Sequence, residues 1–107
     1  MRLLLTGAPQ WRSAVEDAEP TALDVVKHRS ELDATIAEAV DHWRPERIGV
    51  IEHCILRLAL RELEVGETPP KVVISEAVQL AHWFAGAKAP AFVNGVLDAL
   101  ARRAGRL

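Results

Sequence analysis

The chain has 107 residues, of which 50% are apolar and 26% are charged, so it is long enough for one folded domain and too apolar for a disordered tail. Its formal net charge of -2 lacks the strong positive balance typical of nucleic-acid-binding domains. A single cysteine, Cys54, excludes an internal disulfide and a multi-thiolate metal site. No apolar run approaches the roughly 20 residues that a membrane span needs, and no signal-peptide pattern is present, so we expect a cytoplasmic protein.

Apolar residues recur every three or four positions from about residue 21, which predicts helices. We expect the first helix to begin after the N-cap Thr21 and to end before Pro45, because proline disfavours a helical conformation at the residue that precedes it. Its expected buried face consists of Leu23, Val26, Leu32, Ile36, Val40 and Trp43.

A second helix is predicted from Pro45 or Glu46 to about Val65, with Gly66 as its stop. Its expected stripe consists of Ile48, Ile51, Ile55, Leu58 and Glu62, widened by Leu56, Leu60 and Leu63. A helix that is apolar over so much of its circumference usually lies at the centre of a bundle.

A third helix is predicted to start with Thr68 as N-cap and two prolines in its first turn, and to end at Gly86. Its expected face consists of Val73, Ala77, Leu80 and Phe84. A fourth helix is predicted from Pro90 to Arg103. Its expected buried side consists of Phe92, Val93, Val96, Leu97 and Leu100.

These elements predict an all-α fold, a compact antiparallel helical bundle over residues 21–107, preceded by a weakly structured N-terminal segment over residues 1–20. Charge is uneven along the chain, because residues 86–107 hold four basic side chains and one acidic side chain. This basic end has an ordinary explanation, since cations near the C-terminus of a helix interact favourably with its dipole.

Three strings in the second half of the chain carry a family pattern: WRPERIGVIEHCILRLALRELEVG at 43–66, PPKVVISEAVQLA at 69–81 and FVNGVLD at 92–98. In this order and spacing they resemble the C-terminal part of the NusB family of transcription antitermination factors. The similarity covers about residues 23–100. A NusB-like domain of small-subunit rRNA cytosine methyltransferases shares the helical architecture and is a related alternative.

The resemblance implies binding rather than catalysis, with no cofactor and no metal. Family members pair with the small-subunit ribosomal protein NusE and bind boxA RNA, and so help RNA polymerase to resist termination, notably on rRNA operons. They usually begin with an arginine-rich helix, whereas only Arg2 and Arg12 are basic here before Lys27. Each lost phosphate contact removes a counterion-release contribution, so we expect RNA binding to be weak or lost.

The resemblance places Phe92 at the RNA-facing edge, where an exposed ring can stack on a base; a core role on the apolar stripe is equally consistent with its spacing. Lys88 lies just before it, and Arg102 and Arg103 belong to the basic end, so these three cations are the candidate phosphate contacts. Lys88 can equally be an ordinary solvated lysine.

The family places an acidic residue that contacts the ribosomal protein at the position of Glu52. Arg57, five residues on, is a second candidate for the partner surface, and we expect it to form an ion pair with Glu76 or Glu62 that fixes helix register. An exposed glutamate is often merely solvated, so Glu52 has that alternative.

Asn94 and Gly95 are expected to serve structure. Gly95 inside a helix costs roughly 1 kcal/mol, which close helix packing would offset. The family often has asparagine where Ser75 stands, so a hydrogen bond from Asn94 to Ser75 would tie the two helices together more weakly here.

The four histidines are 14, 11 and 29 residues apart, so no pair has the i, i+4 spacing of metal ligands on a helix. The run Glu52-His53-Cys54 cannot converge on one substrate, because consecutive helical residues point about 100° apart. We therefore expect no enzyme and no metal site. Trp43 and Trp83 have the spacing of core or interface anchors.

Two functional hypotheses follow. The first is an antitermination adaptor that binds NusE and, weakly, boxA-type RNA. The second is an interaction module that has lost RNA binding and covers its exposed apolar surface with a second copy of itself.

Overall fold

The computed structural model describes residues 22–40 and 48–107. These ranges contain α2 (Arg29–Val40), α3 (Val50–Val65), α4 (Pro70–Phe84) and α5 (Ala89–Arg103), and residues 22–27 form a further helical segment. The described ranges contain no strand, so the all-α prediction is confirmed. The predicted segment 1–20, together with Thr21 and Trp43, lies outside the described residues.

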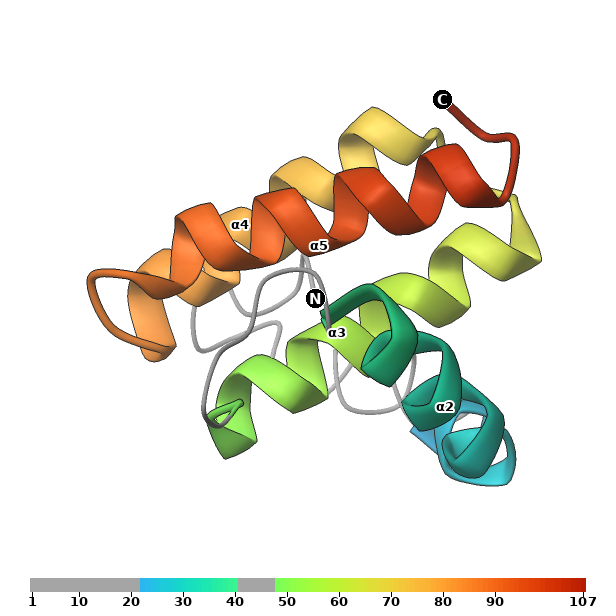
Figure 1. Ribbon diagram of the computed structural model, residues 1–107, viewed down its shortest axis with the longest axis horizontal. Coiled ribbons are helices and arrows are strands. Elements are labelled where there is room, and N and C mark those ends of the chain that lie inside the picture. The colour runs from blue at the N-terminus through green and yellow to red at the C-terminus, as the bar shows by residue number, and fades with distance from the viewer. Residues whose placement is uncertain (1–21, 41–47) are drawn as a thin grey trace, which may run out of the picture.

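The helices pack as a bundle in which α4 and α5 lie side by side and run in opposite directions (Figure 1). Helix α3 lies beneath this pair, and α2 packs against both α3 and α5. Because α3 contacts all three other helices, its predicted central position is confirmed. The side chains that fill the space between the helices are Leu32, Ile36, Ala39, Val40, Ile55, Leu56, Ala59, Leu60, Leu63, Val73, Ile74, Ala77, Leu80, Ala81, Ala89, Val93, Val96, Leu97, Leu100 and Ala101.

The buried face of the first predicted helix is only partly right. Leu32 is buried, as are Ile36 and Val40 that follow it, but Leu23 is 64% exposed and Val26 is 69% exposed. Nine residues separate Leu23 from Leu32, which is half a turn out of phase at about 100° per residue, so the two cannot share a face. Val25, seven residues before Leu32, packs against the core instead.

Helix α3 begins later than the sequence suggested. Residues 48 and 49 are not helical, and Gly49 is the N-cap of a helix that ends at Val65 as predicted. Ile51 was expected on the apolar face but is 48% exposed, because it lies in the first turn and on the edge of the stripe.

Helix α4 has Pro69 as its N-cap and Pro70 in its first turn, so the prediction of Thr68 as N-cap is wrong. Phe84, expected on the buried face, is the last residue of α4 and is 52% exposed, so that expectation is wrong. Helix α5 begins at Ala89, one residue before the predicted start, and buries the expected side except for Phe92, which is half-buried.

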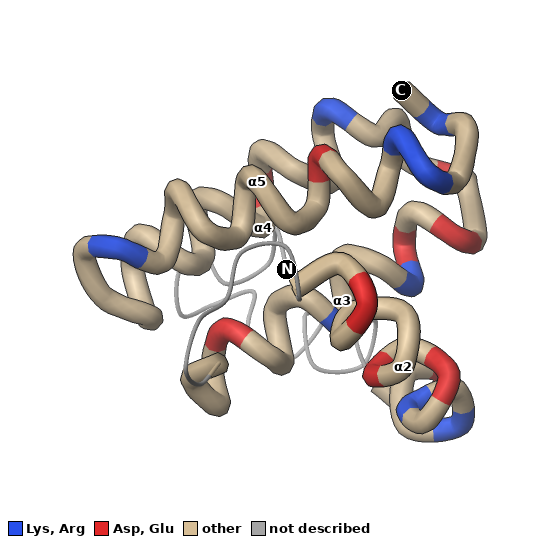
Figure 2. The backbone as a smooth tube through the Cα atoms, in the orientation of Figure 1, with Lys and Arg blue, Asp and Glu red and all other residues tan. Residues whose placement is uncertain are grey.

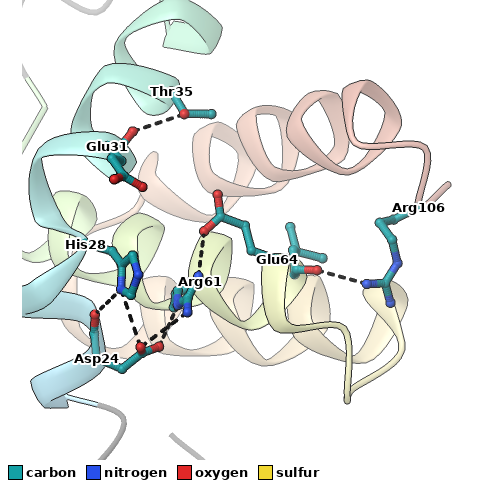
Figure 3. Close-up of polar contacts among 8 residues, drawn as sticks. Asp24, His28, Glu31, Thr35, Arg61, Glu64 and Arg106 are labelled. Atoms are coloured by element: carbon teal, nitrogen blue, oxygen red, sulfur yellow. Dashed lines mark hydrogen bonds and ion pairs between the residues drawn. The ribbon is translucent and has the colours of Figure 1, made fainter.

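The end of α3 is held by a contact with the C-terminal residues of the chain. Gly66 adopts the left-handed conformation with φ 79°, and its N–H donates to the Glu62 carbonyl. Arg106 reaches back from beyond α5, and its Nη1 donates to the Leu63 carbonyl at 2.9 Å (Figure 3). This bond satisfies a carbonyl that the last turn of a helix leaves without an intrahelical partner.

We expect Gly66→Ala to lower the free energy of unfolding more than Gly86→Ala does. Both glycines have positive φ, so alanine costs about 1–2 kcal/mol at either position. A Cβ at Gly86 would meet nothing within 4 Å, whereas one at Gly66 would lie 2.6 Å from Arg106 Nη1. Displacing that guanidinium removes its hydrogen bond, which is worth about 0.5–1.5 kcal/mol.

Urea denaturation followed by circular dichroism measures both effects. In an Arg106→Ala background the two glycine substitutions should cost the same. A larger cost at Gly66 that persists without the Arg106 side chain would contradict this account.

Candidate nucleic-acid and partner interface

Lys88 and Phe92 lie at one end of α5. Lys88 is the N-cap of the helix and is exposed, and the Phe92 N–H approaches its carbonyl at 3.5 Å. Phe92 packs its ring partly against the core while part of its surface stays accessible. Phe92 is thus half-buried, so its ring is neither sealed in the core nor fully exposed, and its stacking on RNA stays a prediction.

Arg102 and Arg103 lie at the other end of the same helix. Lys88 and Arg102 are 14 residues apart, which corresponds to about 21 Å along a helix. In Figure 2 the basic positions of α5 accordingly appear at its two ends. The predicted RNA contacts therefore form two separate groups rather than one patch.

The two arginines engage different neighbours. Arg102 Nε donates to Asp98 Oδ2 at 2.9 Å within α5, whereas Arg103 Nη2 donates to Glu38 Oε2 at 2.9 Å on α2. Both side chains remain more than half exposed. Each guanidinium thus keeps donors available to solvent or to a ligand, because it carries five N–H groups.

A groove of about 630 Å³ runs between α4 and α5. Its lining consists of Lys71, Ile74, Ser75, Val78, Gln79, His82, Pro90, Asn94, Asp98, Arg102 and Leu107. Ser75 and Asn94 therefore face the same space, and both are exposed. No hydrogen bond joins them within the described ranges, so the expected tie between the two helices is absent, and both side chains project toward the groove instead.

Two further members of the predicted structural group lie on these helices. Gly95 is half-buried on α5, and Glu76 is half-buried on α4. Glu76 takes part in an interaction of its own.

Two exposed aromatic side chains, Trp83 and Phe84, lie at the end of α4. Trp83 is 48% exposed, which rules out the core alternative considered for it. Its ring meets that of Phe84 edge to face, with centroids 6.3 Å apart. Trp43, the other tryptophan considered as an anchor, lies outside the described residues.

Glu52 occupies the third position of α3, and its carboxylate folds back toward the start of the helix. A Cβ at Gly49 would lie 2.7 Å from Glu52 Oε1, so the absence of a side chain at Gly49 leaves room for this carboxylate. A negative charge near the N-terminus of a helix interacts favourably with the helix dipole. Glu52 is half-buried, so it has a structural role whether or not a partner contacts it.

Arg57 forms the interhelical ion pair that the sequence suggested, but with a different carboxylate. Its Nε and Nη2 donate to the two oxygens of Asp33 on α2, at 2.6 and 3.1 Å, rather than to Glu62 or Glu76. His53 Nε2 lies 3.2 Å from Asp33 Oδ1. The hydrogen bond from Arg57 is the main cause that lowers the pKa of Asp33 below its ordinary value of 3.8.

A second pair of the same kind joins the segment before α2 to α3. Arg61 donates to both oxygens of Asp24, at 2.5 and 3.3 Å, and His28 Nδ1 lies 3.4 Å from Asp24 Oδ1 (Figure 3). The hydrogen bond from Arg61 lowers the pKa of Asp24. Arg57 and Arg61 are one helical turn apart, so one edge of α3 holds α2 through Asp33 and the preceding segment through Asp24.

The described residues hold no group of three or more side chains that could bind a metal ion. His42 lies outside the described ranges. None of the helices in these ranges is long and apolar enough to cross a membrane.

Comparison with known proteins identifies relatives. The profile of the NusB family matches residues 15–102. The transcription antitermination protein NusB of Solibacter usitatus is 41% identical over 90 residues, covering 80% of this chain and 62% of the relative. The protein of the same name from Anaeromyxobacter sp. (strain Fw109-5) is 40% identical over 93 residues, covering 87% of this chain and 65% of the relative.

A third relative, the transcription antitermination protein NusB of Rubrobacter xylanophilus, is 40% identical over 104 residues and is covered over 75% of its length. The chain thus spans less than two thirds of the first two relatives. No solved structure shows a significant match.

Proposed function

Because the chain belongs to the NusB family, we propose that it is a binding component of transcription antitermination in the cytoplasm, with no catalytic step of its own. The match of the family profile over residues 15–102 is the observation that carries this proposal. In the proposed role the chain binds the ribosomal protein NusE and boxA-type RNA, and joins the antitermination complex of RNA polymerase on rRNA operons.

The proposed RNA contacts are the cations at the two ends of α5 and the ring of Phe92. Exposed Lys88 and the half-exposed guanidinium groups of Arg102 and Arg103 can meet phosphates. The accessible part of Phe92 can stack on an unpaired base, which is worth about 1–3 kcal/mol. With cations in two separated groups and a net charge of -2, we expect modest and salt-sensitive RNA binding.

The proposed protein contact is the start of α3. The Glu52 carboxylate lies at the helix N-terminus, and Arg57 lies on the same helix with its side chain held by Asp33. A half-buried carboxylate at the start of a packed helix can attract a cation on the partner.

One observation favours the second candidate, a self-associating interaction module. Trp83 is 48% exposed and Phe84 is 52% exposed, and their rings meet edge to face at the end of α4. Exposed apolar patches are often covered by another chain. Analytical ultracentrifugation at micromolar concentration distinguishes the two candidates, because a strict monomer excludes stable self-association.

We expect Glu52→Lys to weaken binding to NusE by about tenfold or more, because reversing a charge at a contact costs on the order of 1–3 kcal/mol. Isothermal titration calorimetry of the full chain with the ribosomal protein measures the change. Glu67→Lys, in the exposed connection between α3 and α4, is the matched control with the same change in net charge.

Equal affinity of the parent chain and Glu52→Lys for the ribosomal protein would show that Glu52 does not contact it. Circular dichroism verifies that α3 stays folded in Glu52→Lys. Glu52→Gln removes the negative charge without placing a cation at the helix N-terminus, so it separates loss of the contact from destabilisation of α3.

A further inference from the structure

We propose that the groove between α4 and α5 is a single-stranded RNA site, in which Ser75, Gln79 and Asn94 read the bases while Lys71 and Arg102 hold the backbone. This inference rests on the proposed function, and it assigns base recognition to side chains other than the contacts named there. The groove residues that carry it belong to two antiparallel helices whose positions are fixed by the core.

The cations of the groove are suitably placed for a polyanion. Lys71 lies in the first turn of α4 and Arg102 in the last turn of α5, so the antiparallel packing brings them to the same end. His82 and Pro90 line the other end, and the 11 residues from Lys71 to His82 correspond to about 16 Å of helix. A chain of several linked nucleotides, rather than a compact ligand, matches an open channel of that length.

Between these ends the groove presents uncharged groups that can form hydrogen bonds. Ser75 and Gln79 are one turn apart on α4, Asn94 faces them from α5, and all three are exposed. Within residues 22–40 and 48–107 these three side chains form no hydrogen bond with the rest of the chain, so their donors and acceptors are available together. Amide and hydroxyl groups of this kind can recognise the exposed edges of unpaired bases.

The remaining lining combines cations with apolar surface, which suits the phosphates and the flat base and ribose faces of RNA. Ile74, Val78 and Pro90 offer apolar surface for base or ribose faces. Asp98 is the one carboxylate side chain in the lining, and Arg102 holds it at 2.9 Å. From Ala77 to Leu97 the sequence contains no acidic residue, although the chain has 15 in total. Phosphates would therefore meet little repulsion along most of the groove.

The test is fluorescence anisotropy of the full chain with short labelled homopolymers of uridine, adenosine and cytidine, measured over a range of salt concentrations. We expect Gln79→Ala and Asn94→Ala to reduce the ratio between the strongest and weakest homopolymer affinities by about fivefold or more, without changing the dependence on salt. We expect Lys71→Ala to weaken all three by similar factors and to reduce the log–log salt slope by about 0.7.

Two matched controls lie away from the groove. Lys27→Ala removes an exposed lysine from the 22–27 segment, and this segment contacts α3 through Asp24. Ser30→Ala removes an exposed hydroxyl from α2. Both should leave affinity and base preference at the parent values, whereas Ser75→Ala should change base preference. Circular dichroism verifies that each variant is folded.

The outcomes separate the groove from the wider proposal. RNA binding by the parent chain that no groove variant alters overturns the groove assignment and leaves the proposed function standing. Absence of RNA binding by the parent overturns both. Groove variants that bind RNA normally but lose affinity for the ribosomal protein would identify a peptide site and also overturn the inference.

Discussion

Leu56→Ala should lower the free energy of unfolding by about 2–5 kcal/mol, which is the range observed when a buried leucine is truncated and leaves a cavity. Leu56 is fully buried on α3, the helix that contacts α2, α4 and α5. Because Leu56 has no exposed surface, the removed methyl groups leave a gap inside the core. Because a domain of this size is stable by only about 5–15 kcal/mol, the loss is a large fraction of the total.

Urea denaturation followed by circular dichroism provides the measurement. Leu23→Ala, at a leucine that is 64% exposed, should change stability by no more than about 0.5 kcal/mol. Leu56→Met, which conserves volume, should cost less than about 1.5 kcal/mol. Equal effects at Leu23 and Leu56 would contradict the placement of the core.

Breaking the pair between Asp33 and Arg57 should destabilise the chain by about 1–2 kcal/mol near neutral pH, because a guanidinium that is 14% exposed loses a bidentate partner. A double-mutant cycle with Asp33→Ala and Arg57→Ala isolates the coupling between them. The pair of Asp98 and Arg102 is the control, since these side chains are 43% and 66% exposed and their coupling should be about 0.3–0.5 kcal/mol.

The contribution of Asp33 should also depend on pH in a defined direction. The pKa of Asp33 is lowered in the folded chain, chiefly by the hydrogen bond from Arg57, so the unfolded state binds its proton more tightly. The stabilisation is therefore complete well above the ordinary carboxyl pKa of 3.8 and is lost as the pH falls through that value toward the lowered one.

Parent and Asp33→Asn should accordingly differ most near neutral pH and converge in acid. A difference in stability that is constant across this acidic range would show that Asp33 acts through packing rather than charge.

The types of the helices and some of their ends followed from local chemistry. Gly66 ends α3 because it adopts a left-handed conformation that side chains disfavour, and Pro70 begins α4 because the first turn needs no N–H from it. The buried side of α5 followed from periodicity, because Val93, Val96, Leu97 and Leu100 share one helix face. Family membership followed from short strings whose order and spacing are properties of the sequence alone.

Contacts between helices depended on the tertiary structure. Arg57 pairs with Asp33, which is 24 residues away, and no local pattern selects that carboxylate over Glu62 or Glu76. The groove exists only because α4 and α5 pack in antiparallel fashion, which brings Asn94 opposite Ser75 and Lys71 beside Arg102. The sequence by itself determined the helical elements, the buried side of α5 and the family, because these depend on neighbours within a few residues. The packing of the whole core decided which side chains at the edges of the apolar faces are buried and which polar side chains meet.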